Sequence, residues 1–147
     1  MRETADRANS REGANEAYLN RALENVRPSI RYWAVVGLAE LDSADARNAV
    51  HGAMADASAV VRIAAAGMVL RRDASDGQAL DVLREELQSP HEWVRLHAAT
   101  ALDEAGEAAR PALHELQAAL EDGENKYVVR VANHAVNVLL GTINDVR

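Results

Sequence analysis

The amino-acid sequence predicts an all-α protein, an α-solenoid of about three to four helical-hairpin repeats with about seven main helices. Two observations predict this class: an unusual apolar composition and a short phrase that recurs four times. Thirty of the 147 residues are alanine, none is phenylalanine, and aromatic residues make up only 3%. Alanine favours helices and lets them pack closely, whereas sheets prefer β-branched and aromatic residues.

The recurring phrase is an apolar residue, an arginine, and then small or apolar residues at helical spacing. Its copies are Ile30-Arg31-Tyr32-Trp33-Ala34, Val61-Arg62-Ile63-Ala64-Ala65, Val94-Arg95-Leu96-His97-Ala98 and Val129-Arg130-Val131-Ala132. The arginines lie 31, 33 and 35 residues apart, and the alanines 31, 33 and 34 apart. In the fourth copy the arginine therefore comes one residue late. Units of this length bury their apolar faces only by stacking on one another.

A second amphipathic segment lies between successive phrases, so each repeat is predicted to be two helices. Its apolar residues keep the i, i+3, i+4, i+7 spacing of a helix face in Ala46/Ala49/Val50/Ala53, Leu80/Leu83/Leu87 and Leu113/Leu116/Leu120. Residues that favour turns separate the helices. Ser89-Pro90-His91-Glu92 predicts a serine N-cap with proline at the first helical position, and Pro111 predicts another helix start.

The repeat spacing also predicts the organisation of the chain. We expect a polar, frayed segment over residues 1–13 and a repeat domain over 14–147. Within that domain the repeats lie near 29–56, 57–88, 89–122 and 123–143. A partial repeat over 14–26 precedes them, and Tyr18, Leu19, Leu23 and Val26 mark its single helix.

Charge and cysteine content exclude several classes of function. The net charge of −7 argues against nucleic acid and against membrane surfaces, because both attract basic proteins. The absence of cysteine excludes disulfides, thiolate metal sites and cysteine nucleophiles. No signal peptide is recognisable near Met1, and no apolar run reaches the roughly 18 residues that span a bilayer. We expect a soluble protein whose compartment stays undecided.

The repeated phrase resembles HEAT repeats of the short bacterial type over roughly residues 14–141. Four stretches are similar to the HEAT-like domain attached C-terminally to many bacterial sulfatases of the alkaline-phosphatase superfamily: Arg31-Tyr32-Trp33-Ala34-Val35-Val36-Gly37-Leu38, Glu92-Trp93-Val94-Arg95-Leu96-His97-Ala98-Ala99, Ala109-Arg110-Pro111-Ala112-Leu113 and Tyr127-Val128-Val129-Arg130-Val131-Ala132-Asn133-His134-Ala135. This resemblance implies an accessory domain that docks on a catalytic domain, in the periplasm or outside the cell. It implies no catalytic residue here, because the chain lacks the enzymes' C/S-x-P-x-R motif.

No catalytic, cofactor-binding or metal-binding residues are predicted. The histidines form no H-E-x-x-H or similar pair; His97 and His134 could approach each other across the stack, but a structural histidine is the commoner case. The four phrase arginines allow two interpretations, a basic ladder that recognises an acidic partner or a structural bond to a neighbouring turn. Recurrence at the repeat period favours the structural one, with Asp56 and Asp122 as acceptors.

Two sets of residues are predicted to bind a partner. Tyr32, Trp33, Trp93 and Tyr127 lie near the starts of the arginine-bearing helices, where they should line one edge, either as interface anchors or as plugs between repeats. The last helix, about 126–143, is apolar nearly all round, and Val131, Val138 and Leu140 belong to it. Because such a helix is normally buried, we expect it to pack against a second copy, a catalytic domain or a partner's helix or strand.

Together these observations predict a non-enzymatic protein-docking scaffold without a cofactor. Its partner is expected to be a protein, either the catalytic domain of a parent sulfatase-like hydrolase or a second copy of the chain. The alternatives are a homo-oligomerising structural protein and a HEAT-like chromophore lyase or DNA glycosylase relative. The acidic charge disfavours the glycosylase.

Overall fold

The computed structural model describes residues 15–142, and over these residues the backbone forms helices joined by turns, without any strand. This confirms the all-α class. The predicted polar segment 1–13 and the predicted helical residue Ile143 lie outside the described residues. The chain forms two compact units divided between Val69 and Leu70, and each is described by itself.

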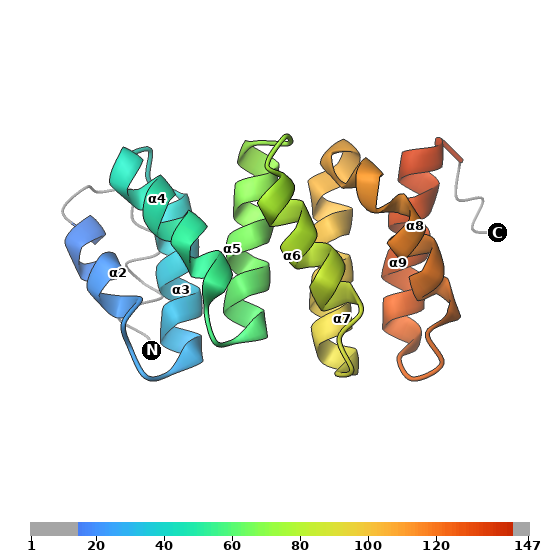
Figure 1. Cartoon of the computed structure of the whole chain (residues 1–147), viewed down its shortest axis with the longest axis horizontal. Coiled ribbons are helices and arrows are strands. Elements are labelled where there is room, and N and C mark those ends of the chain that lie inside the picture. The colour runs from blue at the N-terminus through green and yellow to red at the C-terminus, as the bar shows by residue number, and fades with distance from the viewer. Residues whose placement is uncertain (1–14, 143–147) are drawn as a thin grey trace. The chain divides into compact units, whose positions relative to one another are not determined.

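The first unit is built around one long helix. In chain order it contains α2 (Glu16–Ala22), α3 (Pro28–Ala39), α4 (Ala44–Gly52), the 3₁₀ helix η2 (Ala53–Ala55) and the start of α5 (Ala59–Arg72). Helix α3 packs against both α2 and α4 (Figure 1). It buries Ala34, Val35 and Leu38 completely. The recurring alanine of the sequence phrase is thus a core position, where a small side chain lets the helices approach closely.

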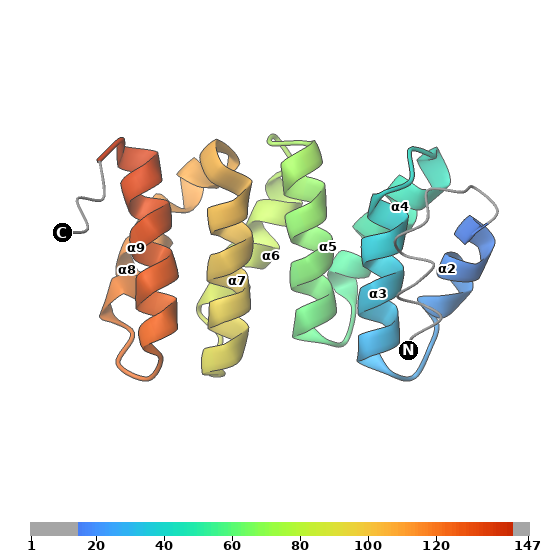
Figure 2. The same ribbon diagram turned by 180° about the vertical axis from the view of Figure 1, so that it is seen from behind.

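The second unit repeats this hairpin arrangement. It contains α6 (Gly77–Leu87), α7 (Glu92–Ala105), η3 (Gly106–Ala112), α8 (Leu113–Ala118), η4 (Ala119–Glu121) and α9 (Lys126–Leu140). Helices α6 and α8 lie on one side of the unit and α7 and α9 on the other (Figures 1 and 2). Helix α7 packs against both α6 and α9. Its Ala98, Ala99 and Leu102 are completely buried.

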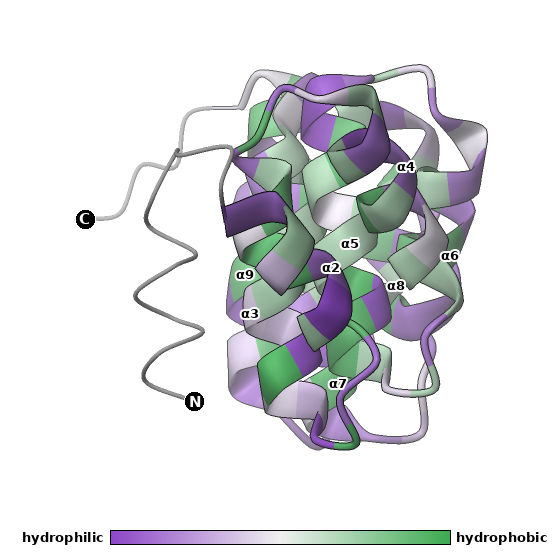
Figure 3. Ribbon diagram, turned by 90° about the vertical axis from the view of Figure 1, so that its left-hand side faces the viewer, coloured by the Kyte–Doolittle hydropathy of each residue, from purple (hydrophilic) through white to green (hydrophobic). Residues whose placement is uncertain are grey.

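Polar side chains begin several of these helices. Ser43 caps α4 by accepting a hydrogen bond from the amide of Ala46, and its hydroxyl donates to Glu16 of α2. Asp76 caps α6 and Asn125 caps α9 in the same way. Each cap satisfies an amide that has no partner within its helix. Hydrophilic and hydrophobic residues are interspersed along the helices that can be seen in Figure 3, as expected of amphipathic helices.

Three local expectations differ from the structure. Helix α2 ends at Ala22, so Val26 is not helical and lies 89% exposed in the following turn. Pro111 lies inside η3, whose tighter 3₁₀ turns extend to Ala112, and α8 begins only at Leu113. Ser89 is not the N-cap of α7. The capping position is His91, whose amide donates to the Ser89 hydroxyl.

Burial predicts how the second unit responds to loss of side-chain volume. Leu102→Ala should lower the free energy of unfolding by about 2–5 kcal/mol, because it removes a completely buried side chain and leaves a cavity. The same change at Leu140, which is half exposed, should alter it by no more than about 0.5 kcal/mol. Urea unfolding followed by circular dichroism measures both. Equal losses would contradict this placement of the core.

Candidate functional site

The first arginine of the repeated phrase joins two turns of the first unit. The Arg31 side chain holds Asp56 through two hydrogen bonds of 2.7 and 2.8 Å, and its third nitrogen donates to the Asn25 carbonyl at 2.8 Å. Asn25 lies before α3 and Asp56 lies before α5, so one planar guanidinium connects both turns. Its hydrogen bonds to Asp56 hold the pKa of that carboxyl below its usual value.

Arg62, the second phrase arginine, bonds the turn that precedes its own helix. It donates to the carbonyl oxygens of Asp56 and Ala57 at 2.8 and 3.1 Å. Asp56 also accepts the amide of Ser58 at 2.7 Å. The turn before α5 is therefore held from both sides, by Arg31 through the Asp56 carboxylate and by Arg62 through main-chain carbonyls.

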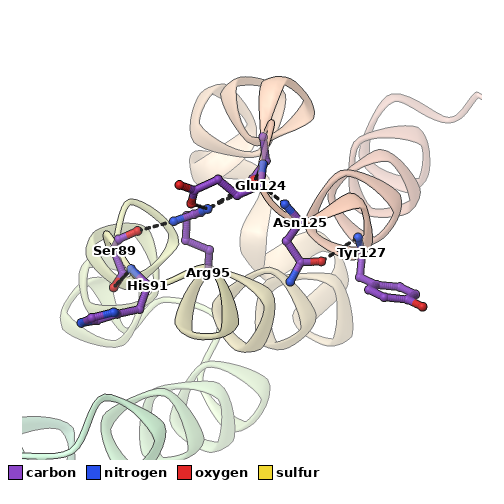
Figure 4. A network of polar contacts seen from close by, with 7 residues as sticks. Ser89, His91, Arg95, Glu124, Asn125 and Tyr127 are labelled. Atoms are coloured by element: carbon purple, nitrogen blue, oxygen red, sulfur yellow. Dashed lines mark hydrogen bonds and ion pairs between the residues drawn. The ribbon is translucent and has the colours of Figure 1, made fainter.

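Arg95, the third, lies at the centre of a network of polar contacts in the second unit (Figure 4). It donates to the Ser89 carbonyl at 2.9 Å, to Asp122 at 2.6 and 3.3 Å, and to Glu124 at 2.6 Å. Asp122 in turn accepts the amides of Glu124 and Asn125, both at 2.9 Å. The Arg95 guanidinium is the main reason that the pKa of Asp122 falls to about 2, and the acids raise the pKa of Arg95.

Arg130 behaves differently from the other three. It is exposed and makes no hydrogen bond or ion pair with the part of the chain that the structure describes. Counting back from the buried Ala132, the position equivalent to Arg31 and Arg95 is Val129, which is half-buried. The structural interpretation of the phrase arginines is thus confirmed for Arg31, Arg62 and Arg95 and wrong for Arg130.

The histidines form no common site in the described residues. His134 of α9 contacts Asp103 of α7 through Nδ1 at 2.7 Å, so its ring links two packed helices. His97 is exposed. Between residues 15 and 142 no three His, Asp or Glu side chains are grouped so as to hold a metal ion.

The four aromatic residues fall into two different environments. Tyr32 and Trp33, in the first unit, are half-buried and pack edge to face with ring centres 5.4 Å apart. Trp93 and Tyr127, in the second unit, are 58% and 49% exposed. They lie at the starts of α7 and α9, which run side by side from the same end of the unit (Figures 1 and 2).

An open groove lies beside Trp93. Its volume is about 520 Å³, and it is lined by Pro90, His91, Glu92, Trp93 and Glu124. Sequence reasoning identified Trp93 but missed the two glutamates. A signal was present, since Glu92 and Glu124 each lie close to the start of a phrase helix, as the two aromatic residues do.

A second cavity of about 370 Å³ lies between α6, α7 and α8, lined by Leu87, Gln88, Arg95, His114, Glu115, Ala118, Ala119, Glu121 and Asp122. Arg84 donates to Oε1 of Glu115, and Oε2 is buried without a partner among the described residues. Among the lining residues, Arg95 and Asp122 bond each other and Glu115 bonds Arg84. This cavity is therefore framed by structural ion pairs.

Helix α9 is buried on one side only. Val128, Ala132, Ala135, Val136 and Leu139 pack within the second unit. Val131 is half-buried, and Val138 and Leu140 are 47% and 51% exposed. The helix ends at Gly141, whose positive φ of 66° lets the Thr142 amide bond back to the Asn137 carbonyl. The expectation of a helix buried nearly all round is not met within the unit.

None of the helices between residues 15 and 142 combines the length and the hydropathy needed to cross a membrane.

The contrast between Arg95 and Arg130 gives a matched test. Arg95→Ala should lower the free energy of unfolding by roughly 2–4 kcal/mol, because it leaves the Asp122 carboxylate, only 5% exposed, without its cation. Arg130→Ala should change it by at most about 0.5 kcal/mol. Chemical denaturation of the two variants measures the difference. A similar loss in both would contradict the assignment of Arg130 to the surface.

The depressed pKa of Asp122 predicts a pH dependence. Its carboxyl titrates near 2 in the folded chain against an ordinary 3.8, so the stabilisation is fully present above about pH 4 and is lost as the pH falls toward 2. At pH 7, Asp122→Asn should be less stable than the unaltered chain by about 2 kcal/mol. Unfolding measured from pH 7 to pH 2 should show this gap closing. A gap that stays constant would refute the charge-based explanation.

Comparison with known proteins agrees with the geometry. The family model described as HEAT repeats matches residues 53–137. No curated protein matches the chain. The matched residues include the paired helices, two of the turn-binding arginines and both exposed aromatic residues. HEAT repeats commonly serve as protein-interaction scaffolds. The chain belongs to the HEAT-repeat family.

Proposed function

We propose that this chain is a non-catalytic protein-docking scaffold. The observation that carries the proposal is the pair of exposed rings, Trp93 and Tyr127, at the adjoining starts of α7 and α9. Tryptophan and tyrosine are enriched among the residues that contribute most to protein–protein binding. An open groove beside Trp93 adds a concave surface next to the larger ring.

The two rings contribute little to the core of their own unit. That core is made by completely buried residues such as Leu83, Leu102 and Leu116. Large apolar side chains held in water forgo the free energy that burial would supply, roughly 25 cal/mol for each Å². Contact with a partner surface would recover it.

We also propose that this chain has no catalytic activity of its own. The support is the role of the ionisable pair with the most strongly shifted pKa values. Arg95 and Asp122 bond each other, and both also bond main-chain groups of the turns on either side. Shifted pKa values arise in structural ion pairs as well as in active sites, and these bonds fit the structural role.

We further propose that the docking partner is the catalytic domain of a sulfatase-like hydrolase, for which this chain serves as the C-terminal accessory domain. The support is the resemblance of residues 92–99 and 127–135 to such domains. Those two stretches contain Trp93 and Tyr127, so the resembling residues and the exposed aromatic residues coincide.

Self-association through α9 is the second candidate. Val138 and Leu140 lie in the last turns of the helix with about half of their surface in water. Two copies of the helix packed symmetrically would cover Leu140, whereas Val138 lies about 200° away around the helix axis. This candidate uses a different face from the aromatic edge.

Site-specific photocrosslinking distinguishes these proposals. With p-benzoylphenylalanine in place of Trp93, we expect covalent adducts with one partner protein in extracts of the source cells. The same probe in place of Gln117, an exposed residue of α8, should give few adducts. Mass spectrometry identifies the partner.

The identity of the adducts separates the finer proposals. Peptides from a sulfatase-like catalytic domain would support the accessory-domain role. A probe in place of Leu140 that yields covalent homodimers would support self-association. Equal adduct yields at positions 93 and 117 would refute docking at the aromatic edge.

A further inference from the structure

The groove beside Trp93 carries an excess of negative charge. Glu92 and Glu124 both line it, together with Pro90, His91 and the indole. Arg95 contacts Glu124, but Asp122 already matches the charge of that arginine. The net charge of −7 over the whole chain adds to the local field. The groove therefore attracts cations.

The indole of Trp93 is open to a ligand. The side chain is more than half exposed, and no cation or ring of the described residues stacks on it. Tryptophan binds cations over its face more strongly than tyrosine or phenylalanine does. An aromatic face with carboxylates in the same groove supplies both contacts that an organic cation uses.

The neighbouring aromatic residue already shows this chemistry. The ammonium of Lys126 lies 5.5 Å from the centre of the Tyr127 ring. Tyr127 holds the position in α9 that Trp93 holds in α7, five residues before the buried alanines Ala132 and Ala98. Of two equivalent aromatic positions, one is thus filled by a lysine of the chain itself, and the other lies in an acidic groove without a cation.

The side chains that line the groove favour a guanidinium over other cations. A metal ion would need a cluster of ligands, and the described residues contain none. A guanidinium stacks flat on an indole and donates in-plane hydrogen bonds to carboxylates at the same time. An ammonium cannot use both contacts in this way. A volume of about 520 Å³, open to solvent, accommodates such a side chain and its adjoining backbone.

We infer that the groove formed by Trp93, Glu92 and Glu124 binds an arginine side chain presented by an extended basic segment of a partner protein. The inference rests on the proposed docking function and gives the partner its chemistry. The guanidinium stacks on Trp93 and donates to Glu92, and Oε1 of Glu124 accepts a further bond. Arg95 keeps Oε2 of Glu124 and so orients that carboxylate.

The test uses peptide probes of defined charge and the full chain. The first probe is a nine-residue peptide of glycine and serine with arginine at three positions, titrated by calorimetry in 150 mM NaCl. A second carries lysine at those positions and a third carries glutamate. We expect saturable binding of the arginine peptide, about threefold or more weaker binding of the lysine peptide, and none of the glutamate peptide.

Matched variants locate the binding. Trp93→Ala should weaken the arginine peptide at least tenfold, and Glu92→Gln about fivefold. Glu85→Gln removes the same charge from an exposed position on α6, outside the groove, and should change the affinity less than twofold. Glu92 makes no hydrogen bond with the residues that the structure describes, so its replacement by glutamine should leave folding intact. In a Trp33→Phe background, the fluorescence of Trp93 should also change on binding.

Each outcome decides the inference. Equal effects of Glu92→Gln and Glu85→Gln would reduce the binding to the overall charge and overturn it. So would full binding to Trp93→Ala, or a lysine peptide that binds as tightly as the arginine peptide. If no basic peptide binds while the photocrosslinks at position 93 persist, the inference of an arginine-binding groove is refuted and the proposed docking function is retained. Loss of both results would overturn the docking function as well.

Discussion

The guanidinium fork that joins one turn to the next is the interaction on which both units depend. A helical hairpin of this length has too little apolar surface to fold alone, so neighbouring hairpins must hold a fixed register. Helix ends also leave main-chain carbonyls without partners. Arg31 and Arg95 answer both requirements, because each bonds a carbonyl at one turn and an aspartate at another. A lysine has no planar fork with which to span two turns in this way.

The sequence predicted this interaction because its spacing is regular. A contact made in every repeat must reappear at the repeat length, and the arginines and buried alanines do so. The same argument explains the failure at Arg130, whose one-residue shift turns the side chain by about 100° on a helix. The details of the helix ends were less predictable. Pro111 and Ser89 are helix-start residues in general, but their roles depend on a 3₁₀ segment and on an N-cap at His91, which local sequence does not encode.

The candidate site was predictable only in part, for a related reason. The sequence shows all four aromatic residues near the starts of the phrase helices, but it does not show their exposure. Trp33 lies one residue before its buried alanine and is half-buried, whereas Trp93 lies five residues before its buried alanine and is exposed. Glu124 lies 29 residues from Arg95 in the chain, and only the packing of α7 against α9 brings the two side chains into contact. The sequence marks both glutamates as residues near helix starts, but it does not show that they line the same groove.

The contact of Lys126 with Tyr127 limits the number of partner cations that this surface binds. Two equivalent aromatic rings would offer a partner two cation-binding positions, but the ammonium of Lys126 already contacts the ring of Tyr127. A basic segment of a partner would therefore bind through the groove beside Trp93 alone. Binding through one such site would be weak and rapidly reversible. A lasting complex would need a second point of attachment, because binding at one point raises the effective concentration of the partner at the other. The surface is in this sense suited to a partner that binds at several points at once.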